Sequence, residues 1–248
     1  MIIRRINTIE EFERCLEIQR KAWGFETDLD VVPVPIFVLS REFGGLVLGA
    51  FEGEEMIGFS LAFPLKEDSE LVLHSHMTAV LPEYQGKGVG YRLKLKQREE
   101  AAKLGYSKIT WTYDPLQSRN AYFNLHKLGA EAVKFYRNFY GVLNSETNRG
   151  FPTHRFLVEW TVEERKKEIP PVEVMISLEN PPEELPEADV IGIEIPADIE
   201  EEKRRLGKEA IKFYNAEERV FSHYISNYKA IDFIKGEKCY YVLVRKSN

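Results

Sequence analysis

The chain has 248 residues, of which 44% are hydrophobic and 30% are charged, a composition typical of soluble globular proteins and not of disordered or fibrous ones. With 34 Lys and Arg against 40 Asp and Glu its net charge is −6, which argues against broad binding to nucleic-acid phosphates. At this length folding buries roughly 70–75% of the surface of the unfolded chain, so neither disulfides nor a structural metal is needed for stability.

The first part of the chain predicts a strand, two helices and an antiparallel meander. Residues 2–6 are typical of a short strand, and Thr8 with Glu11 forms a capping box that starts an amphipathic helix ended by Gly24. A second short helix is expected over residues 36–43. Three strands follow, over residues 46–52, 55–65 and 70–81.

The middle of the chain alternates between helix and strand. A glycine-rich turn leads into a helix that ends near Lys103, and a strand is expected over residues 108–113. The next helix is predicted to be capped by Ser118 and closed by Gly129. Two aromatic-rich strands then follow, over residues 133–139 and 154–162.

Residues 163–189 differ in composition from both neighbouring segments, because they hold five prolines among many glutamates. We expect a linker or an extended crossing there, between a first domain over residues 1–162 and a small α/β subdomain over residues 190–248. Most of the negative charge belongs to the tail, since residues 1–162 have 20 basic and 21 acidic side chains and the remainder has 14 and 19. The tail is expected to form a strand over 190–195, a long helix over 197–225 and a hairpin over 228–244.

Cysteine usage and hydropathy favour a cytoplasmic protein. Cys15 and Cys239 have no spacing typical of a zinc site or a redox pair, so we expect both to be reduced and buried. The N-terminal segment becomes charged after three residues, unlike a secretory signal. No apolar run reaches the roughly 18 residues of a membrane span, so no membrane partner is expected.

The most informative segment is a glycine-rich turn between the strand that ends near Val80 and the following helix. It reads Gln85-Gly86-Lys87-Gly88-Val89-Gly90. Glycine permits positive φ and close backbone approach, so N–H groups at the start of the helix can bind an anion, most naturally a pyrophosphate. Its GxGxG spacing differs from the GxGxxG of dinucleotide-binding folds, and no P-loop is present. On the glycines alone, a turn without a ligand is an equal alternative.

This segment resembles the signature [QR]xxGx[GA] of the GNAT superfamily of acetyl-CoA-dependent acyltransferases, which Gln85, Gly88 and Gly90 match. The order of elements over residues 1–162 is similar to a whole GNAT domain, and a subgroup of predicted acetyltransferases carries an extension like residues 163–248. The resemblance implies an α/β (α+β) fold, with a mixed, mostly antiparallel sheet flanked by helices and a small C-terminal α/β subdomain. The blocks most similar to that subgroup are Trp111–Leu116, Asn120–Ala121, Lys127–Gly129 and Arg155–Trp160.

The resemblance also implies acetyl-CoA, or another acyl-CoA, as donor and an amine as acceptor, with no metal. The pantetheine arm would lie where the strand ending near Val80 splays from the strand over 108–113, and the pyrophosphate would meet the turn. The residues expected to contact CoA are Val80, Gln85, Gly86, Lys87, Gly88, Val89, Gly90 and Arg92, together with Ser118 and Asn120. The later basic side chains can attract the 3′-phosphate, but most are expected to form a solvated face: Lys94, Lys96, Arg98 and Lys103.

Acylation of an amine requires a base, a donor for the departing thiolate and N–H groups for the oxyanion. Eleven residues before Gln85, where histone-type members carry a glutamate base, this chain has His74, whose imidazole can act at neutral pH. His76 projects from the same face of the strand and is the second candidate. The alternative for both is a half-buried structural histidine. No third ligand at a telling spacing supports a metal site.

The usual tyrosine acid of the family is absent, because Leu125 occupies its position four residues after Ala121. Tyr122 lies one helical turn away and is the predicted acid, with core packing as the alternative. His126 and Tyr113 are weaker candidates for the same role.

The sequence therefore predicts an acyl-CoA-dependent N-acyltransferase in which the amine attacks the thioester directly. The alternatives are a catalytically inert CoA-binding module and a protein-interaction adaptor. The tail either covers one side of the acceptor cleft or forms a homodimer interface. Loops over residues 24–35 and 140–153 are expected to recognise the acceptor.

Overall fold

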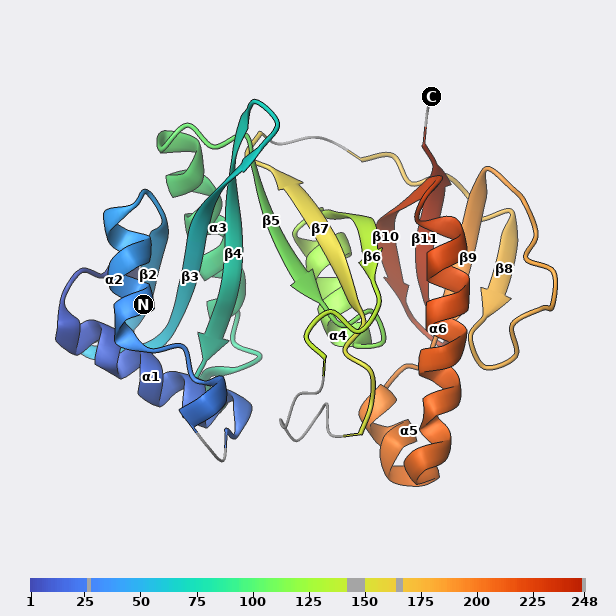
Figure 1. Cartoon of the computed structure of the whole chain (residues 1–248), viewed down its shortest axis with the longest axis horizontal. Helices are drawn as coiled ribbons and strands as arrows, with labels where there is room; N and C mark the ends of the chain where they lie inside the picture. Colours follow the sequence, from blue (N-terminus) through green and yellow to red (C-terminus); the bar gives the residue numbers. More distant parts are fainter. Residues whose placement is uncertain (26–27, 142–149, 164–166, 247–248) are drawn as a thin grey trace. The chain divides into compact units, whose positions relative to one another are not determined.

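The computed structural model describes residues 1–25, 28–141, 150–163 and 167–246 (Figure 1). The chain divides into two compact units, Met1–Trp111 with Thr161–Glu164 and Thr112–Trp160 with Arg165–Asn248. This division runs through the predicted first domain, because residues 112–160 pack with the C-terminal segment. The functional boundary at residue 162 stays a prediction, and residues 164–166 of the expected linker lie outside the described residues.

The first unit is built on a sheet in the order β1-β2-β3-β4-β5, in which β1 to β4 pair antiparallel and β5 runs parallel to β4. Strand β5 leads into the second unit at Thr112. The elements are β1 (Ile2–Arg5), α1 (Ile9–Trp23), α2 (Val34–Glu42), β2 (Leu46–Glu52), β3 (Glu55–Glu67), β4 (Glu70–Val80), α3 (Val89–Lys103) and β5 (Lys108–Tyr113).

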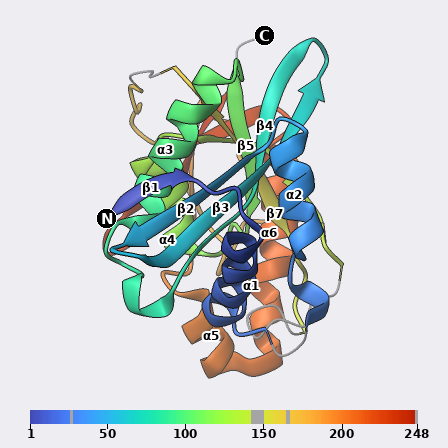
Figure 2. The same cartoon turned by 90° about the vertical axis from the view of Figure 1, so that its left-hand side faces the viewer.

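Helices cover both faces of this sheet. Helix α3 packs on one face against β2, β3 and β4, while α1 and α2 pack on the other (Figure 2). The predicted capping box at the start of α1 is confirmed, with both Thr8 and Glu11 hydrogen bonds present, and Gly24 ends the helix in the left-handed conformation. Phe12, Phe37 and Phe59 are fully buried in consecutive ring contacts and form the core beneath α1 and α2.

The second unit continues with strands in the order β7-β6-β10-β11-β9-β8, antiparallel except for the β8–β9 pair. Phe156 of β7, Phe221 of α6 and Tyr241 of β11 are buried against one another and form the centre of its core. The elements are α4 (Ser118–Ala121), the π-helical segment η3 (Tyr122–Lys127), β6 (Glu131–Tyr136), β7 (Arg155–Thr161), β8 (Val174–Ser177), β9 (Val190–Ile195), α5 (Ile199–Leu206), the 3₁₀ turn η4 (Gly207–Ala210), α6 (Ile211–Tyr224), β10 (Tyr228–Lys235) and β11 (Cys239–Arg245).

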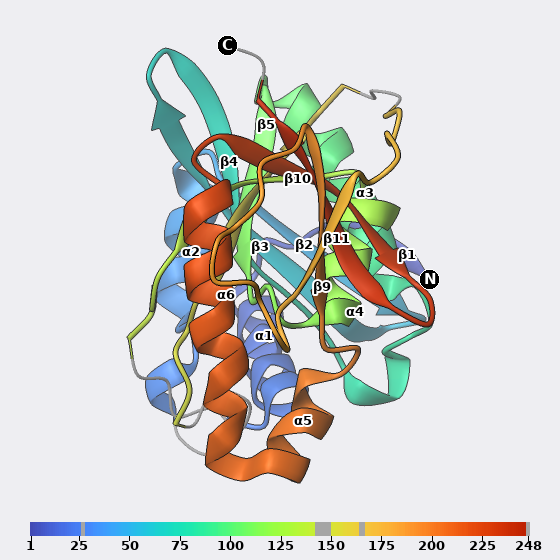
Figure 3. The same cartoon turned by 90° about the vertical axis from the view of Figure 1, so that its right-hand side faces the viewer.

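Two local expectations for the second unit are wrong, and a third segment contains a strand that was not expected. The single helix over 197–225 is broken at Gly207, whose φ of 57° and ψ of −128° no helix accommodates, and α5 and α6 therefore point in different directions (Figure 3). The proline-rich segment contains the edge strand β8, because its prolines flank the strand and leave Val174–Ser177 free to pair. Ser118 is not a cap: the N-cap of α4 is Gln117, and the Ser118 hydroxyl donates to the carbonyl of Ala197.

The mixed, mostly antiparallel sheet with flanking helices confirms the expected fold class. Cys15 and Cys239 are both buried and unpaired, as expected. Within the described residues, no helix is long and apolar enough to cross a membrane.

Candidate active site

The glycine-rich turn presents open backbone at the start of α3. Gly86 and Gly88 have φ of 76° and 80°, and a Cβ placed on either would meet no atom within 4 Å. Gly88 is the N-cap of α3, and no side chain caps the helix there. The first N–H groups of the helix are therefore available to an anion, on which the helix dipole acts favourably. This arrangement fits a pyrophosphate.

Some side chains around the turn hold it in place or are buried, and others are exposed to solvent. Gln85 Nε2 donates to the carbonyl of Val80 at 3.1 Å and thereby ties the turn to the end of β4. Val89 is buried, so that only its backbone can meet a ligand. Lys87 is exposed, with Nζ 5.3 Å from the centre of the Tyr84 ring, and Arg92 is also exposed. These two supply the positive charge beside the turn.

Strands β4 and β5 pair over a short stretch only. Their parallel register runs from Val72–Lys108 to His74–Thr110, although β4 continues to Val80. Both strands lie within the described residues, and the residues of β4 after His74 therefore have no partner in the β4–β5 register (Figure 1). Unpaired strand edges offer backbone donors and acceptors to an amide-bearing chain such as pantetheine.

His74 lies at the last pair of the β4–β5 register. It is half-buried, and its Nδ1 is 3.0 Å from the hydroxyl oxygen of Thr110, which is 1% exposed. Burial, together with nearby His76 and the charge of Lys94, lowers the pKa of His74 to about 4. The imidazole is therefore neutral at neutral pH. When Nδ1 carries the proton and donates it to Thr110, Nε2 is left free to accept one.

His76 is the extra residue of a β-bulge. The β3–β4 register passes from Ala62–Ser75 to Leu61–Met77 and skips His76. Its ring is exposed and lies 5.9 Å from that of Phe63, the cross-strand partner of His74, so both imidazoles lie beside Phe63. A bulge interrupts the ladder and leaves backbone groups of β4 unpaired close to His74.

One of the four basic side chains of α3 that were considered for a solvated face is buried. Lys94 is 4% exposed and points toward the sheet, where burial lowers its pKa to about 7. Its place on the buried stripe of α3 with Leu93, Gln97 and Ala101 is a helical periodicity that the sequence contained.

The helix after β5, in the second unit, carries the remaining predicted residues. Ser118 is buried with its hydroxyl used by Ala197, whereas Asn120 is exposed. Leu125, in the position of the family's acid, is 1% exposed and packed in the core. Tyr122 is half-buried, with its ring stacked on that of His126 at 4.7 Å.

Two further contacts in the second unit concern the weaker acid candidates. His126 Nδ1 is 3.1 Å from Oδ1 of Asp232, a buried carboxylate on β10. The two residues are 106 positions apart in the sequence, so local sequence patterns could not predict this pair. Tyr113 is buried, and its hydroxyl donates to that of Tyr241 at 3.2 Å. Burial raises the pKa of Tyr113, which leaves it in the core as a poor proton donor.

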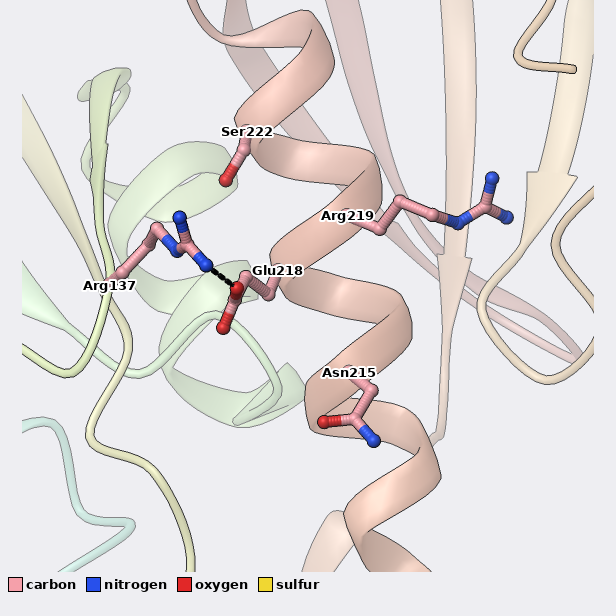
Figure 4. A pocket seen from close by; sticks show the side chains of 5 residues that line it. All are labelled: Arg137, Asn215, Glu218, Arg219 and Ser222. Carbon is pink, nitrogen blue, oxygen red and sulfur yellow. Dashed lines mark hydrogen bonds and ion pairs between the residues drawn. The ribbon is translucent and has the colours of Figure 1, made fainter. Parts of the chain in front are cut away.

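A polar hollow of about 470 Å³ lies on the second unit along α6 (Figure 4). Arg137 pairs with Glu218 across it, while Arg219 points away and donates to the carbonyls of Pro182 and Glu183. Its basic groups are thus already engaged, and it shares no residue with the glycine-rich turn.

Parts of both loops predicted to recognise the acceptor, residues 26–27 and 142–149, lie outside the described residues. In the portion of the chain that the structure describes, no group of three or more His, Cys, Asp or Glu side chains is placed to hold a metal ion.

Comparison with known proteins supports the family that the sequence resembles. Residues 8–130 match the family model described as the acetyltransferase (GNAT) family. No curated protein shows significant similarity to the chain.

Solved structures share the fold at low sequence identity. The ribosomal-protein-S18-alanine N-acetyltransferase of Escherichia coli has a TM-score of 0.53 and 16% identity, covering 67% of this chain and 96% of its own. The putative acetyltransferase yncA of Salmonella typhimurium, solved with acetyl-CoA, has a TM-score of 0.54 and 18% identity, covering 68% and 97%. The ribosomal-protein-alanine N-acetyltransferase of Brucella melitensis has a TM-score of 0.50 and 15% identity, covering 65% and 99%. At these identities the likeness shows the fold alone.

Proposed function

Residues 8–130 place the chain in the GNAT family of acetyltransferases, and on this premise we propose that it transfers an acetyl group from acetyl-CoA to an amine. The observation that carries the proposal is the uncapped N-terminus of α3 behind Gly86 and Gly88. It directly follows a strand whose pairing to its neighbour ends early.

The donor would be held by backbone more than by side chains. The pyrophosphate would accept hydrogen bonds from the N–H groups of the turn, with Lys87 and Arg92 adding charge. The pantetheine arm would lie along the free edge of β4 up to Val80, whose carbonyl already accepts from Gln85. Ser118 and Asn120 are further proposed contacts, and for Ser118 this requires release of its bond to Ala197.

His74 is the proposed base. The amine nitrogen attacks the thioester carbon, the carbon–sulfur bond breaks, and the sulfur leaves as a thiolate that takes up a proton. Attack makes the nitrogen cationic and far more acidic than a free ammonium, so even a base with a pKa of about 4 can accept its proton at Nε2. Free N–H groups at the His76 bulge would stabilise the oxyanion.

The proton donor for the thiolate is assigned to Tyr122. Its phenol is half-buried and rests on His126, which Asp232 orients. A cytoplasmic location, a homodimer formed through residues 190–248, and acyl groups other than acetyl are predictions of the sequence that belong to this proposal.

The test combines binding and turnover. Calorimetric titration with acetyl-CoA should show binding, and a screen of amines, aminoglycosides, amino acids and peptide N-termini should find sustained thiol release. His74→Ala should reduce kcat by roughly 10²- to 10⁴-fold with CoA affinity nearly unchanged. The absence of binding at millimolar acetyl-CoA would refute the proposal. Binding without turnover on any acceptor would support the inert CoA-binding module instead.

A further inference from the structure

Lys94 is a buried basic side chain in the first unit that the proposed chemistry does not use. It lies on α3, six residues after Gly88, and is 4% exposed. Lysine is almost never buried to this extent unless its amino group finds partners, because removing the charged form from water is costly. What Nζ contacts therefore indicates why the residue is there.

Its Nζ connects three elements. It donates to Gln97 Oε1 at 2.7 Å within α3 and to Ser75 Oγ of β4 at 3.0 Å. It also lies 3.8 Å from the centre of the Trp111 ring on β5, a distance that gives a favourable cation–π interaction. Ser75 and Trp111 are themselves 4% and 7% exposed.

The position of these contacts along the strands is informative. Ser75 directly follows His74 and Trp111 directly follows Thr110, and His74–Thr110 is the last pair of the β4–β5 register. Because side chains alternate along a strand, Ser75 and Trp111 face α3 while their neighbours face the opposite side. Nζ therefore joins the two strands at the first position where they no longer pair with each other.

One partner of Lys94 is itself incompletely paired. Gln97 Nε2 is buried and has no hydrogen-bond partner among the described residues. Nearly all buried polar atoms in folded proteins are paired, and an apolar side chain at this position would avoid the cost of this one.

We propose that Lys94 is a positioning residue of the acetyl-transfer site, whose Nζ clamps Ser75 and Trp111 so that β4 and β5 separate in a fixed geometry next to His74. The inference rests on the proposed function, since the gap that it shapes is the one assigned to the pantetheine arm. It explains why a basic group is buried under the sheet where an aliphatic residue would pack at lower cost.

The clamp also acts on His74 electrostatically. The charged groups that act on His74 are His76 on the same strand, Lys94 on α3 and Glu67 on β3, whereas Thr110 on β5 is uncharged. Positive charge on Lys94 lowers the pKa of His74, and Glu67 raises it. Removal of the Lys94 charge therefore shifts the pKa of His74 upward.

The experiment compares Lys94→Met and Lys94→Gln with wild type and with Lys235→Met, which removes an exposed lysine of β10 in the second unit. Folding is followed by circular dichroism and thermal unfolding, and kcat/KM for acetyl-CoA by thiol release over a pH range that extends below the wild-type His74 pKa of about 4. Lys94→Met should fold and lose roughly 10- to 100-fold in kcat/KM at pH 7. The acidic limb of its pH–rate profile should move to higher pH, which lost packing alone would not cause.

Lys94→Gln keeps a donor for Ser75 without the charge, so it should recover part of kcat/KM but keep the shifted profile. Lys235→Met should match wild type in both. A folded Lys94→Met with wild-type kcat/KM and an unshifted profile would overturn the proposal. Failure of both Lys94 variants to fold would overturn it as well, because the residue would then serve stability only. If the proposed function is itself wrong, the wild-type protein will neither bind nor turn over acetyl-CoA, which distinguishes that failure from a failure of this inference.

Discussion

Replacing Thr110 by valine tests how His74 is oriented. Valine has nearly the shape of threonine but lacks the hydroxyl that lies 3.0 Å from His74 Nδ1. Thr110 is 1% exposed, so water cannot replace the lost partner. We expect the ring to lose its preference for the form with the proton on Nδ1, the only neutral form in which Nε2 can accept a proton.

The size of the effect follows from the hydrogen bond. A neutral hydrogen bond contributes about 0.5–1.5 kcal/mol net, and each 1.4 kcal/mol of barrier corresponds to about a factor of ten in rate. Thr110→Val should therefore lower kcat by roughly 2- to 12-fold. Since Thr110 is not placed in the CoA site, calorimetric affinity for CoA should stay within about twofold of wild type.

Initial rates of thiol release at saturating acetyl-CoA measure this change, with the best acceptor from the amine screen. Thr112→Val is the matched control, because Thr112 is on the same strand and its hydroxyl faces that of Tyr140 at 3.1 Å. The reasoning is refuted if Thr110→Val retains wild-type kcat while His74→Ala is strongly impaired. His74 would then act without Thr110.

Three further predictions concern the turn, acid stability and the C-terminal segment. Gly88→Ala should cost roughly 1–2 kcal/mol of stability in urea unfolding, because φ at this residue is 80°. The same change should weaken CoA binding as measured by calorimetry. An unchanged affinity for CoA would contradict the turn as the binding site. Burial raises the pKa of Glu100, but hydrogen bonds from Lys103 and other basic neighbours outweigh it and lower the pKa to about 2. The stabilisation that Glu100 contributes is therefore present above its unfolded pKa near 4.5 and is lost as the pH falls toward 2. Glu100→Gln should lose roughly 1–2 kcal/mol of unfolding free energy at pH 7, and its unfolding free energy should vary less with pH between 4.5 and 2. A variant whose unfolding free energy depends on pH as in wild type would contradict this prediction. Asp198→Ala removes the helix cap whose carboxylate accepts from the backbone N–H groups of Glu200 and Glu201. It should cost about 1 kcal/mol of stability in urea unfolding and leave the affinity for CoA unchanged. Unchanged stability would show that the cap contributes nothing.

Local signals in the sequence were sufficient for much of the first unit. The capping box of Thr8 and Glu11, the turn at Gly53 and the strand over 108–113 depend on residues close together in the chain, and all three appear in the structure. The break at Gly207 was missed because the apolar pattern continues on both sides of it. The edge strand β8 was missed because its flanking prolines dominated the composition.

The site depends more on long-range placement. Gln85 to Gly90 could be assigned from spacing, since the glycines and the helix start are adjacent. Thr110 could not, because only the β4–β5 register brings it to His74 from 36 residues away. The bulge at His76 likewise depends on pairing with β3. The burial of Lys94 could have been predicted from the sequence, because its position on the helix beside Leu93 and Ala101 indicates a buried face.

The account depends most on the glycine-rich turn as the pyrophosphate site. Backbone amide signals of Gly86, Gly88, Val89 and Gly90, followed by NMR in the wild-type protein, test it directly during titration with CoA and, separately, with pantetheine. CoA should move these signals in a saturable way, whereas pantetheine, which lacks the pyrophosphate, should leave them in place. If CoA binds while these amides do not move, the turn is not the phosphate site and the account is contradicted.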